Sequence, residues 1–360
     1  MSYKTREFIS KMFNRFQLSV RYNVRRGYLR KDLKKFKSEG KTLSHEQKEE
    51  LLQYWKQFSS HFTPVWHQFY YEKTGVFDVH FIPEDLMMTD IEDYLNDWSS
   101  AHGIDNKNNY KMYFPEIRHP RAAFRKMRGI FHNDMYGIIS KEQAIENCLQ
   151  MGHVIFKCAM DSGKGGGIKI WKQSDGVDAL KTIINNAPND YLAQEFIKQH
   201  KDLEAINPTS VNSVRIVTFL WDNTIDFLTA YLRMGFPGAE VDNVSAGGCC
   251  SAVRRDGTLV GYGLNKSAEK IYEHPSGFKF NDFKVPSWEK IVKSAIKLHE
   301  KMGNYKLVSW DIAVAEDGEP IFIEMNLIYG AMEYHQLFNG PLFGDRTDEI
   351  LNAVYHKKHK

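Results

Sequence analysis

The strongest constraint in this sequence is a hairpin pattern over residues 308–326, VSWDIAVAEDGEPIFIEMN. An Asp-Gly pair at 317–318 separates two mostly apolar runs, and such a pair is typical of a two-residue type I′ turn. With that turn, Asp311 lies directly opposite Glu324, and Asn326 shares their face because strand side chains alternate. The pattern therefore predicts a hairpin with one apolar face and one face that carries two carboxylates and an amide.

These three polar side chains favour a metal site. Two facing carboxylates repel each other at about 5 Å, so neutralising one of them is expected to relieve strain in the metal-free protein. Paired carboxylates with an amide oxygen are hard ligands, which suit Mg²⁺ that bridges nucleotide phosphates. A solvated acidic hairpin is the alternative, but the apolar opposite face argues against it. We therefore predict that Asp311, Glu324 and Asn326 hold one or two Mg²⁺ ions.

A second motif, residues 155–170, predicts a strand, a glycine-rich loop and another strand. The loop contains Gly163, Gly165, Gly166 and Gly167, and glycines let backbone N–H groups approach a phosphate closely. Lys157 stands inside the first apolar strand, where its charge needs a partner such as a phosphate. The stretch is not a Walker A loop, because the GK[ST] ending is missing and a strand follows. A ligand-free hairpin turn is the alternative.

Arg215 is predicted on an apolar strand, where it shares a face with Val217 and Phe219. An arginine at such a position either forms a structural salt bridge or clamps an anion. The residue alone does not decide between the two.

Composition excludes several classes of protein. The 360 residues are 42% hydrophobic and 26% charged, which is typical of a folded chain. The four cysteines form no CxxC pattern and have no histidine at zinc-finger spacing, so we expect thiols in a reducing cytoplasm. The sequence has neither an apolar run long enough for a membrane span nor a secretory leader. These features predict a cytoplasmic protein.

Positive charge is concentrated at the N-terminus. Residues 1–38 contain twelve Lys or Arg and two acids, a net charge of +10, whereas the whole chain carries +3. The remainder is therefore acidic, which argues against nucleic acid as a partner, because a nucleic-acid binder carries its basic surface on the folded domain.

The same segment is predicted to be helical. Apolar residues recur in it at helical spacing, namely Phe8, Ile9, Met12, Phe13, Phe16 and Val20. The helix either rests on an anionic membrane, giving peripheral contact through residues 1–38 at the inner face, or packs its apolar stripe on the rest of the protein.

Helix signals precede residue 150 and strand signals follow it. Ser44, with Gln47 three residues later, and Ser140 are predicted to begin helices. The aromatic residues of 54–81 are predicted to form the core of a helical cap rather than a ligand platform. Strands then recur as hairpins, which predicts an α+β fold with antiparallel sheets rather than a Rossmann sheet.

Together these motifs resemble the ATP-grasp superfamily, and more closely its branch associated with sugar transfer and polysaccharides. The resemblance covers residues 41–345 and implies an ATP-grasp fold, in which two α+β lobes sandwich ATP, with an N-terminal helical extension. The implied divisions are a basic and aromatic helical region at 1–75, an N-terminal lobe at 76–150, a small subdomain with the glycine loop at 151–200, and a C-terminal lobe with the metal site at 201–360.

The resemblance also implies the nucleotide contacts. Lys157 matches the lysine that precedes the flexible loop, and Lys107 matches an earlier nucleotide lysine, with Lys126 as a second candidate. The implied loop contacts are Gly165, Gly166, Gly167 and Lys169. The segment 192–197 is similar to an adenine hinge, so the implied base and ribose contacts are Gln194, Glu195, Ile197 and Asp202, with Glu204 as an alternative to Asp202.

The strand with Arg215 is similar to one that clamps a substrate or a phosphate, so Arg215 and Lys157 are the implied catalytic residues. Many amino-acid ligases of the superfamily have an arginine two residues before the first metal-binding aspartate, and here that position is Ser309. The identity of the residue that clamps an acyl-phosphate is therefore open.

The resemblance implies an ADP-forming carboxylate–amine ligase that works through an acyl-phosphate. In a polysaccharide or capsule pathway it would join an amino acid to a uronic acid or an amino sugar. Two alternatives stay open: an ATP-grasp kinase that phosphorylates a sugar or another small molecule, and a non-catalytic glycan-binding protein with this fold.

Overall fold

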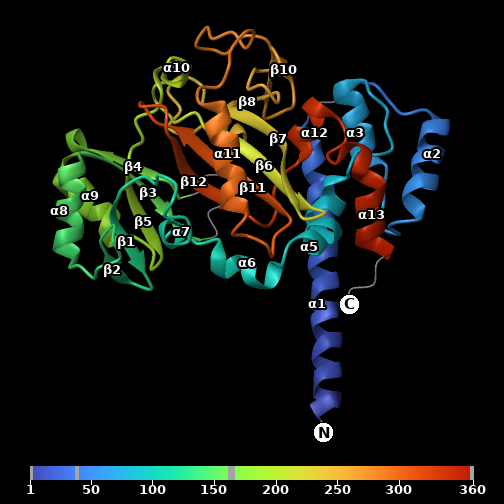
Figure 1. The fold of residues 1–360 in the computed structure, drawn as a ribbon, viewed down its shortest axis with the longest axis horizontal. Coiled ribbons are helices and arrows are strands. Elements are labelled where there is room, and N and C mark those ends of the chain that lie inside the picture. The colour runs from blue at the N-terminus through green and yellow to red at the C-terminus, as the bar shows by residue number, and fades with distance from the viewer. Residues whose placement is uncertain (1–2, 37–39, 161–166, 357–360) are drawn as a thin grey trace. The chain divides into compact units, whose positions relative to one another are not determined.

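A computed structural model describes residues 3–36, 40–160 and 167–356 of the chain (Figure 1). The chain divides into two compact units. The first unit consists of Met1–Asp97 and Ile328–Lys360, and the second of Trp98–Leu327. The structure therefore groups the C-terminal residues with the N-terminal helices, whereas the sequence analysis placed them in the C-terminal lobe.

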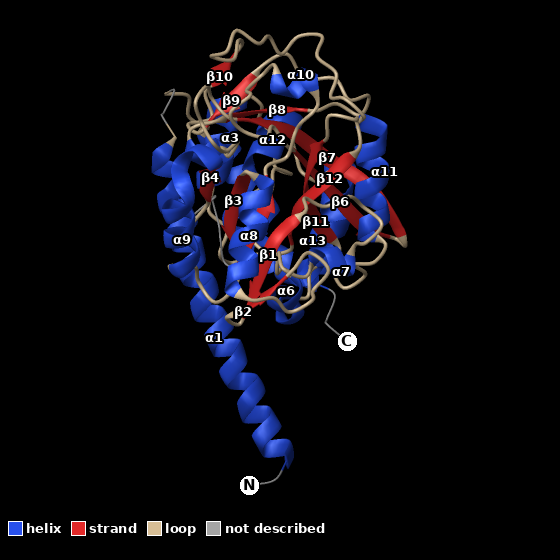
Figure 2. Cartoon of the chain, turned by 90° about the vertical axis from the view of Figure 1, so that its left-hand side faces the viewer, coloured by secondary structure: helices blue, strands red, loops and turns tan. Residues whose placement is uncertain are grey.

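The first unit is helical (Figure 2). Its helices are α1 (Tyr3–Asp32), α2 (His45–Lys56), α3 (Val65–Thr74), α4 (Glu84–Leu86), the π-helix η2 (Met87–Ile91), α5 (Glu92–Leu95), α12 (Glu333–Asn339) and α13 (Thr347–His356), with short 3-10 turns at Leu33–Lys35 and Gly344–Arg346. Ser44 caps α2 reciprocally with Gln47, as predicted. Within the described residues, no helix has both the length and the apolarity to cross a bilayer.

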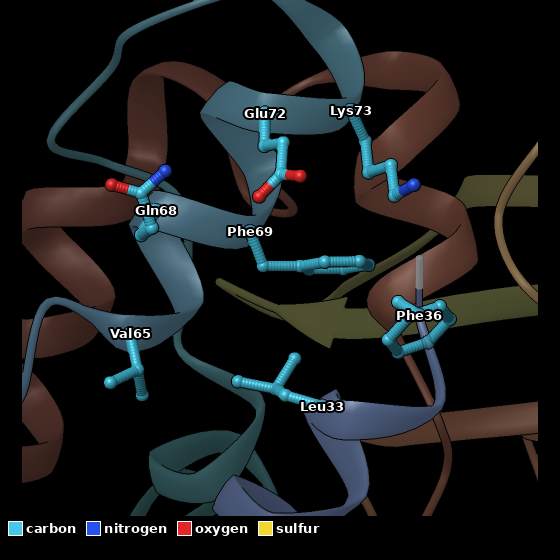
Figure 3. Close-up of a pocket in the computed structure, with 7 residues that line it drawn as sticks. All are labelled: Leu33, Phe36, Val65, Gln68, Phe69, Glu72 and Lys73. Carbon is cyan, nitrogen blue, oxygen red and sulfur yellow. The ribbon is translucent and has the colours of Figure 1, made fainter. Parts of the chain in front are cut away.

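The aromatic residues of the first unit form a core, as predicted. Trp55 and Tyr70 are fully buried, and the rings of Tyr70 and Phe81 stack with their centroids 4.7 Å apart. Phe36, after α1, packs on Phe69 of α3 at 4.4 Å. Figure 3 shows a small pocket at this contact; its lining mixes apolar and polar side chains: Leu33, Phe36, Val65, Gln68, Phe69, Glu72 and Lys73. None of the predicted site residues lines this pocket.

Ion pairs attach α1 to the acidic segment that follows α3. Arg26 pairs with Asp90 at 2.5 Å, and Arg30 pairs with Asp85 at 2.5 Å. In the same segment the buried Glu92 accepts hydrogen bonds from the backbone N–H groups of Tyr329 and Gly330, at 2.7 and 2.9 Å. Burial raises the pKa of Glu92 to about 8, although those two hydrogen bonds oppose the shift.

The second unit contains a smaller, five-stranded antiparallel sheet. Its order is β2 (Ile130–His132), β1 (Ala122–Met127), β5 (Tyr191–Glu195), β3 (His153–Cys158) and β4 (Lys169–Lys172). Helices α8 (Lys141–Met151) and α9 (Gly176–Asn185) contribute to a core on one face, in which Phe124, Phe156 and Trp171 are buried. The sheet takes strands from both sides of residue 150, so the predicted division between two lobes at that residue cuts through one sheet.

A seven-stranded antiparallel sheet forms the rest of the second unit. Its order is β10 (Lys270–Ile271), β9 (Gly263–Asn265), β8 (Cys249–Ala252), β7 (Thr224–Met234), β6 (Val214–Trp221), β11 (Leu307–Val314) and β12 (Pro320–Asn326). Helix α11 (Trp288–His299) packs against β6, β7, β11 and β12. The short helices of this unit are α6 (Trp98–Ile104), α7 (Tyr110–Tyr113) and α10 (Lys201–Glu204), with 3-10 turns at Gln173–Asp175 and Val244–Ala246.

The hairpin of β11 and β12 has the predicted register at the site but a different turn. Asp311 faces Glu324, as expected. Gly318 has a φ of +81°, but Asp317 does not adopt a positive φ, and Ala315 pairs with Glu319 across a three-residue loop. The prediction of a type I′ turn was therefore wrong. A β-bulge after Asp311 shifts the pairing by one residue and so restores the expected partners.

The raised pKa of Glu92 predicts a specific pH dependence. Between its ordinary value of 4.5 and about 8, the folded protein binds more protons than the unfolded chain. The contribution of Glu92 to stability is therefore full at low pH and is lost as the pH rises through about 8. We expect Glu92→Gln to reduce this loss by roughly 1–3 kcal/mol, measured by urea unfolding on both sides of that window. The exposed Glu50→Gln is the control and should keep the wild-type slope, and an unchanged slope in Glu92→Gln would contradict the assignment.

Candidate functional site

A row of polar side chains crosses four neighbouring strands of the large sheet. Glu324 on β12 is the cross-strand partner of Asp311 on β11, which is the partner of Arg215 on β6. Arg215 is in turn the partner of Tyr231 on β7. Directly opposite residues point to the same face of a sheet, so this face presents the predicted carboxylates and the predicted arginine together.

Asp311 and Arg215 form a bidentate ion pair. Arg215 Nε donates to Asp311 Oδ1 and Arg215 Nη2 donates to Asp311 Oδ2, each at 2.7 Å. Asp311 is fully buried. Burial alone would raise the pKa of Asp311, but the Arg215 guanidinium and then that of Arg233 hold it well below its ordinary value. Of the two interpretations of Arg215, the structural salt bridge is therefore present here.

Arg233, on β7, is a second arginine of the site that the sequence analysis did not select. Its Nη2 lies 3.0 Å from Asp311 Oδ2, and it also donates to Ser213 Oγ at 2.8 Å. Its Nε lies 3.5 Å from Asp242 Oδ2, which accepts from the Ser213 backbone N–H at 2.9 Å. Arg233 therefore joins two buried carboxylates. A charge at the end of a long apolar strand was the signal that could have identified it.

The segment 242–248 is positioned by this network. Asp242 begins it, and Gly248 ends it where β7 passes closely. A Cβ on Gly248 would lie 2.5 Å from the Met234 carbonyl oxygen, so only glycine fits without movement of the backbone. The close approach brings the Asp242 carboxylate to Arg233.

Lys107 lies at the same site. Its Nζ is 3.2 Å from Glu324 Oε2, and its backbone N–H donates to the carbonyl of Ala159, just after β3. Burial disfavours its charged form, but Glu324 and Asp105 outweigh this effect and raise the pKa of Lys107. Lys126, the second candidate, instead donates to the Ala187 carbonyl. Lys107 thus lies beside Glu324, whereas the hydrogen bond of Lys126 joins it to the segment after α9.

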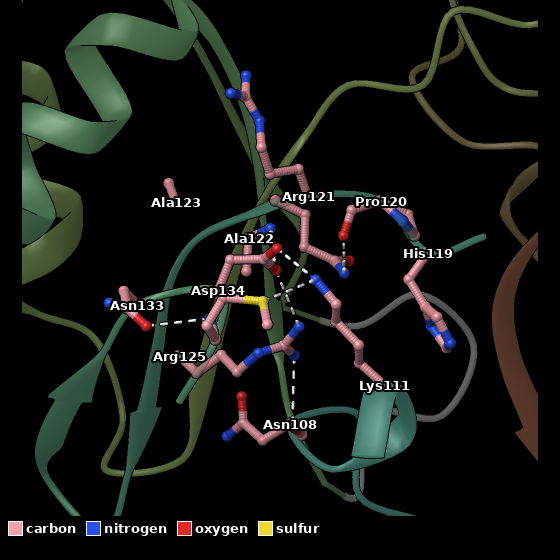
Figure 4. A network of polar contacts seen from close by, with 12 residues as sticks. Asn108, Lys111, His119, Pro120, Arg121, Ala122, Ala123, Arg125, Asn133 and Asp134 are labelled. Carbon is pink, nitrogen blue, oxygen red and sulfur yellow. Dashed lines mark hydrogen bonds and ion pairs between the residues drawn. The ribbon is translucent and has the colours of Figure 1, made fainter. Parts of the chain in front are cut away.

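A buried polar network holds the loop that carries Lys107 (Figure 4). Arg125 on β1 is 1% exposed; it donates to the Asn108 carbonyl at 3.2 Å and lies 3.3 Å from Asp134 Oδ1. Lys111 pairs with the other oxygen of Asp134 at 2.5 Å. These contacts fix the residue next to Lys107 against the small sheet.

Lys157 projects from the face of the small sheet opposite the two helices. Its neighbours Val154 and Phe156 belong to the helix-side core, and Lys157 alternates with Phe156. Burial lowers the pKa of Lys157, although Glu324 opposes the shift. Among the residues that the structure describes, no carboxylate forms an ion pair with Lys157. A buried ammonium in this situation is stabilised by an anion.

The glycine-rich loop is described only at its end. Gly163, Gly165 and Gly166 lie outside the described residues. Gly167 has a φ of +79°, and a Cβ there would lie 3.1 Å from Cys158 Sγ, so this position favours glycine. Lys169 pairs with Phe156 across the strands, which places its exposed side chain on the face away from Lys157. The register thus does not bring Lys169 together with Lys157.

The predicted hinge joins the two sheets. The backbone N–H groups of Glu195 and Phe196 donate to the carbonyls of Arg121 and His153. Ile197 packs in a small apolar cluster with residues of β11, β12 and the turn between them. Gln194 is buried, and its Nε2 lies 3.4 Å from the Pro120 carbonyl oxygen.

The predicted ribose contact lies on α10. Asp202 is about half exposed, and its Oδ2 lies 3.5 Å from His200 Nδ1. Its carboxylate is thus accessible but has no contact with the ion-pair network around Asp311 among those described.

The predicted metal ligands fit Mg²⁺ in part. Glu324 and Asn326 present a carboxylate and a carboxamide on one face, and Asn326 Nδ2 is buried with no hydrogen-bond partner among the described residues. Both oxygens of Asp311, however, accept from guanidinium groups. The described residues contain no group of three or more His, Cys, Asp or Glu side chains arranged for a metal ion. The donor chemistry suits a hard cation at Glu324 and Asn326, and Asp311 could join only by giving up an arginine contact.

Solved structures with a similar chain path include D-alanyl-alanine synthetase A from Vibrio cholerae (12% identity, 70% of this chain and 63% of that chain, TM-score 0.44). They also include the VanG D-Ala:D-Ser ligase from Enterococcus faecalis (14% identity, 71% of this chain and 62% of that chain, TM-score 0.43). A further one is the ATP-grasp ligase PsnB with minimal precursor, Mg and ADP (11% identity, 70% of this chain and 60% of that chain, TM-score 0.41). The chain spans less than two thirds of the length of each of these structures. No curated protein matches the sequence.

A family model settles the classification. The model for sugar-transfer associated ATP-grasp proteins matches residues 86–352, about three quarters of the chain and all of the site described above. This protein belongs to the sugar-transfer associated ATP-grasp family.

Proposed function

We propose that this protein is an ADP-forming carboxylate–amine ligase that works through an acyl-phosphate. The observation that carries the proposal is the convergence of Lys107, Lys157, Arg215 and Arg233 on the face that bears Asp311 and Glu324. Transfer of a phosphoryl group depends chiefly on positioning and on stabilising charge, which such a set of cations supplies.

ATP is bound by residues of both sheets in this proposal. Lys157 and Lys107 contact the phosphates, and the loop with Gly165, Gly166 and Gly167 covers them. The backbone of the hinge at Gln194, Glu195 and Ile197 holds the adenine. We assign the hydrogen bond that the hinge donates to the base to the backbone N–H of Ile197, because the N–H groups of Glu195 and Phe196 already donate to protein carbonyls. Asp202 holds the ribose.

Mg²⁺ accompanies the nucleotide, and the charges of the site support this. Four cations (Lys107, Lys157, Arg215, Arg233) and four carboxylates (Asp105, Asp242, Asp311, Glu324) interact there. Because these charges balance, the phosphates of ATP bring an excess of negative charge that a divalent cation offsets. Glu324 and Asn326 would hold one or two ions, with Asp311 as a further ligand, and the metal would supply charge neutralisation at the phosphates.

The chain's own residues then serve two successive displacements. An oxygen of the substrate carboxylate attacks the γ-phosphorus, and ADP leaves with the bridging oxygen. An amine next attacks the acyl carbon and loses its proton, phosphate leaves, and an amide remains. Arg215 and Lys157 stabilise the negative charge in both steps. Arg233 takes the role that the absent arginine at Ser309 would have, because it reaches the Asp311 carboxylate from β7, across β6.

The substrates are an amino acid and a sugar derivative in this proposal, either a uronic acid or an amino sugar, as in the assembly of a polysaccharide capsule. The family's association with sugar transfer supports this choice. We place the reaction in the cytoplasm, at the inner face of the membrane, where glycans are assembled on lipid carriers.

The first test concerns Lys157. Replacement by Met removes a buried charge that has no ion-pair partner among the described residues, so Lys157→Met should not destabilise the ATP-free protein. It should weaken ATP binding by about ten- to a hundredfold, or about 1.4–2.8 kcal/mol, because a charged hydrogen bond to phosphate is lost. Thermal shift with a non-hydrolysable ATP analogue measures both. Lys169→Met, on the opposite face, is the matched control and should bind like wild type; a loss in Lys169→Met equal to that in Lys157→Met would contradict the assignment.

The second test concerns Glu324. Glu324→Gln should lower turnover by at least about a hundredfold, because a negative ligand at the phosphates is lost. The expectation that this change relieves strain is wrong, since Glu324 faces Lys107 and Asp311 is already neutralised by two arginines. We therefore expect a small loss of stability in urea unfolding. Glu316→Gln, exposed in the turn of the same hairpin, should leave both turnover and stability unchanged. Turnover of Glu324→Gln within a few-fold of wild type would overturn the metal assignment.

The third test identifies the reaction class. The purified protein is incubated with ATP, Mg²⁺, pooled amino acids and uronic-acid or amino-sugar nucleotides, and phosphorus NMR follows the products. We expect ADP and phosphate, and we expect hydroxylamine to trap an acyl-phosphate. Pyrophosphate would exclude the proposed chemistry, and a stable phosphorylated sugar without hydroxamate would identify a kinase.

A further inference from the structure

The first half of α1 is exposed, in contrast to the second half. Large apolar side chains lie in water there, with exposed fractions of 58% for Met12, 57% for Phe13, 66% for Phe16 and 47% for Val20. Tyr22 is the first buried residue among the described side chains of α1. Figures 1 and 2 show this half of α1 running beyond the other helices of its own unit. Of the two interpretations of this stripe, packing on the other helices of the same unit is therefore not seen for Met12, Phe13, Phe16 and Val20.

The second half of α1 anchors the helix. Tyr22, Arg26 and Leu29 are buried, and the ion pairs of Arg26 and Arg30 fasten it to the acidic segment of the same unit. Arg21 and Arg25 contact Tyr329, whose ring lies 4.1 Å from the Arg25 guanidinium. Most of the stability of a helix in a protein comes from packing of its apolar face, so the exposed half depends on this anchor and on whatever covers its apolar side chains.

The chemistry of the exposed half fits a lipid surface. It presents the exposed Met12, Phe13 and Phe16, and residues 3–20 contain four Lys or Arg and one acid, within a segment (residues 1–38) of net charge +10. Apolar aromatic side chains enter the boundary between lipid headgroups and acyl chains, while Lys and Arg bind the phosphates of anionic lipids. Both features are needed for a helix that lies in the plane of a membrane surface.

A second copy of the helix fits less well. The exposed positions 13, 16 and 20 follow the alternating three–four spacing of a coiled coil, but this spacing is not sustained: the longer row of exposed positions, 12, 16, 20, 24 and 28, advances by four residues throughout. A row with that spacing drifts around the helix, so a partner helix would lose contact with it within a few turns. Two copies would also bring together two segments of net charge +10. An anionic bilayer requires no particular spacing of apolar residues, and it attracts the positive charge of the segment.

We propose that the exposed half of α1 is a docking surface for an anionic phospholipid membrane. The apolar side chains of Met12, Phe13 and Phe16 insert between headgroups, and the basic residues of the segment bind lipid phosphates. The packed half of the helix then links the membrane to the first unit. The inference does not depend on the reaction that the second unit catalyses.

Vesicle co-sedimentation of the full chain tests this proposal. Vesicles of phosphatidylcholine with phosphatidylglycerol are compared with vesicles of phosphatidylcholine alone, at low and high salt. We expect binding to the anionic vesicles that weakens with salt. The double variant Phe13→Glu, Phe16→Glu should lower the partition coefficient by at least about tenfold, because it removes the inserted groups and adds negative charge.

A matched control uses two exposed apolar residues of the second unit. Met135 and Ile138 are 76% and 75% exposed, and the variant Met135→Glu, Ile138→Glu adds the same charge away from α1. It should bind vesicles like wild type. Equal vesicle binding by the α1 variant and wild type, or no binding of wild type to anionic vesicles, would overturn the proposal. A concentration-dependent dimer in sedimentation, lost in the α1 variant and without lipid binding, would assign the surface to a second copy instead.

Turnover in solution separates this inference from the proposed ligase activity. The α1 variant keeps all residues of the second unit, so it should retain wild-type turnover while losing vesicle binding. A protein that binds vesicles but has no ligase activity would leave the docking surface supported and the proposed function refuted.

Discussion

The site depends on one buried carboxylate, that of Asp311. It lies on β11 of the large sheet, fully removed from solvent, and two guanidinium groups from β6 and β7 neutralise it. Breaking such a buried pair by removing one partner typically costs about 3–5 kcal/mol, because the other charge is left without compensation. The ion pairs therefore bind β6, β7 and β11 to each other at the point where the chemistry is proposed, and they orient both arginines.

The arrangement of the other charges follows from this one. Because Arg215 and Arg233 engage Asp311 closely, Arg215 lies 4.0 Å from Glu324 and Lys107 is the nearer partner of Glu324, at 3.2 Å. Lys107 in turn is attached by its backbone to the end of β3, the strand that carries Lys157. Ion pairs and one backbone hydrogen bond thus connect the large sheet to the small one, although the two sheets share no strand. Arg215, Arg233 and Lys107 each have a carboxylate partner. Lys157 has no carboxylate partner among the described residues.

The sequence predicted the α+β fold and the facing of Asp311 and Glu324, because alternation and turn position constrain a hairpin strongly. The facing was right although the turn was not: a three-residue loop and a bulge after Asp311 compensate each other, and neither has a clear signal in the sequence. Arg233 was missed because its partners, Ser213 and Asp242, are distant in sequence from Asp311 and meet only through sheet order. The face that Lys169 takes could not be predicted either, because membership of a loop does not reveal which face of the following strand a side chain takes.

The ion pairs of Asp311 also constrain how a metal and a nucleotide could enter. A carboxylate oxygen that accepts from a guanidinium is a poor ligand for Mg²⁺ at the same time, since both cations compete for its lone pairs and repel each other. A phosphate offers Arg215 the same bidentate geometry that Asp311 offers it. With a nucleotide bound, Arg215 would be able to exchange Asp311 for a phosphate, and Asp311 would then be able to supply carboxylate oxygens to a divalent cation that offsets the phosphate charge. Arg233 is held separately by Ser213 and need not move. One arginine would then bind phosphate while the other stays at Asp311, which gives a physical reason for two arginines in a site whose hairpin has a serine, Ser309, in place of an arginine.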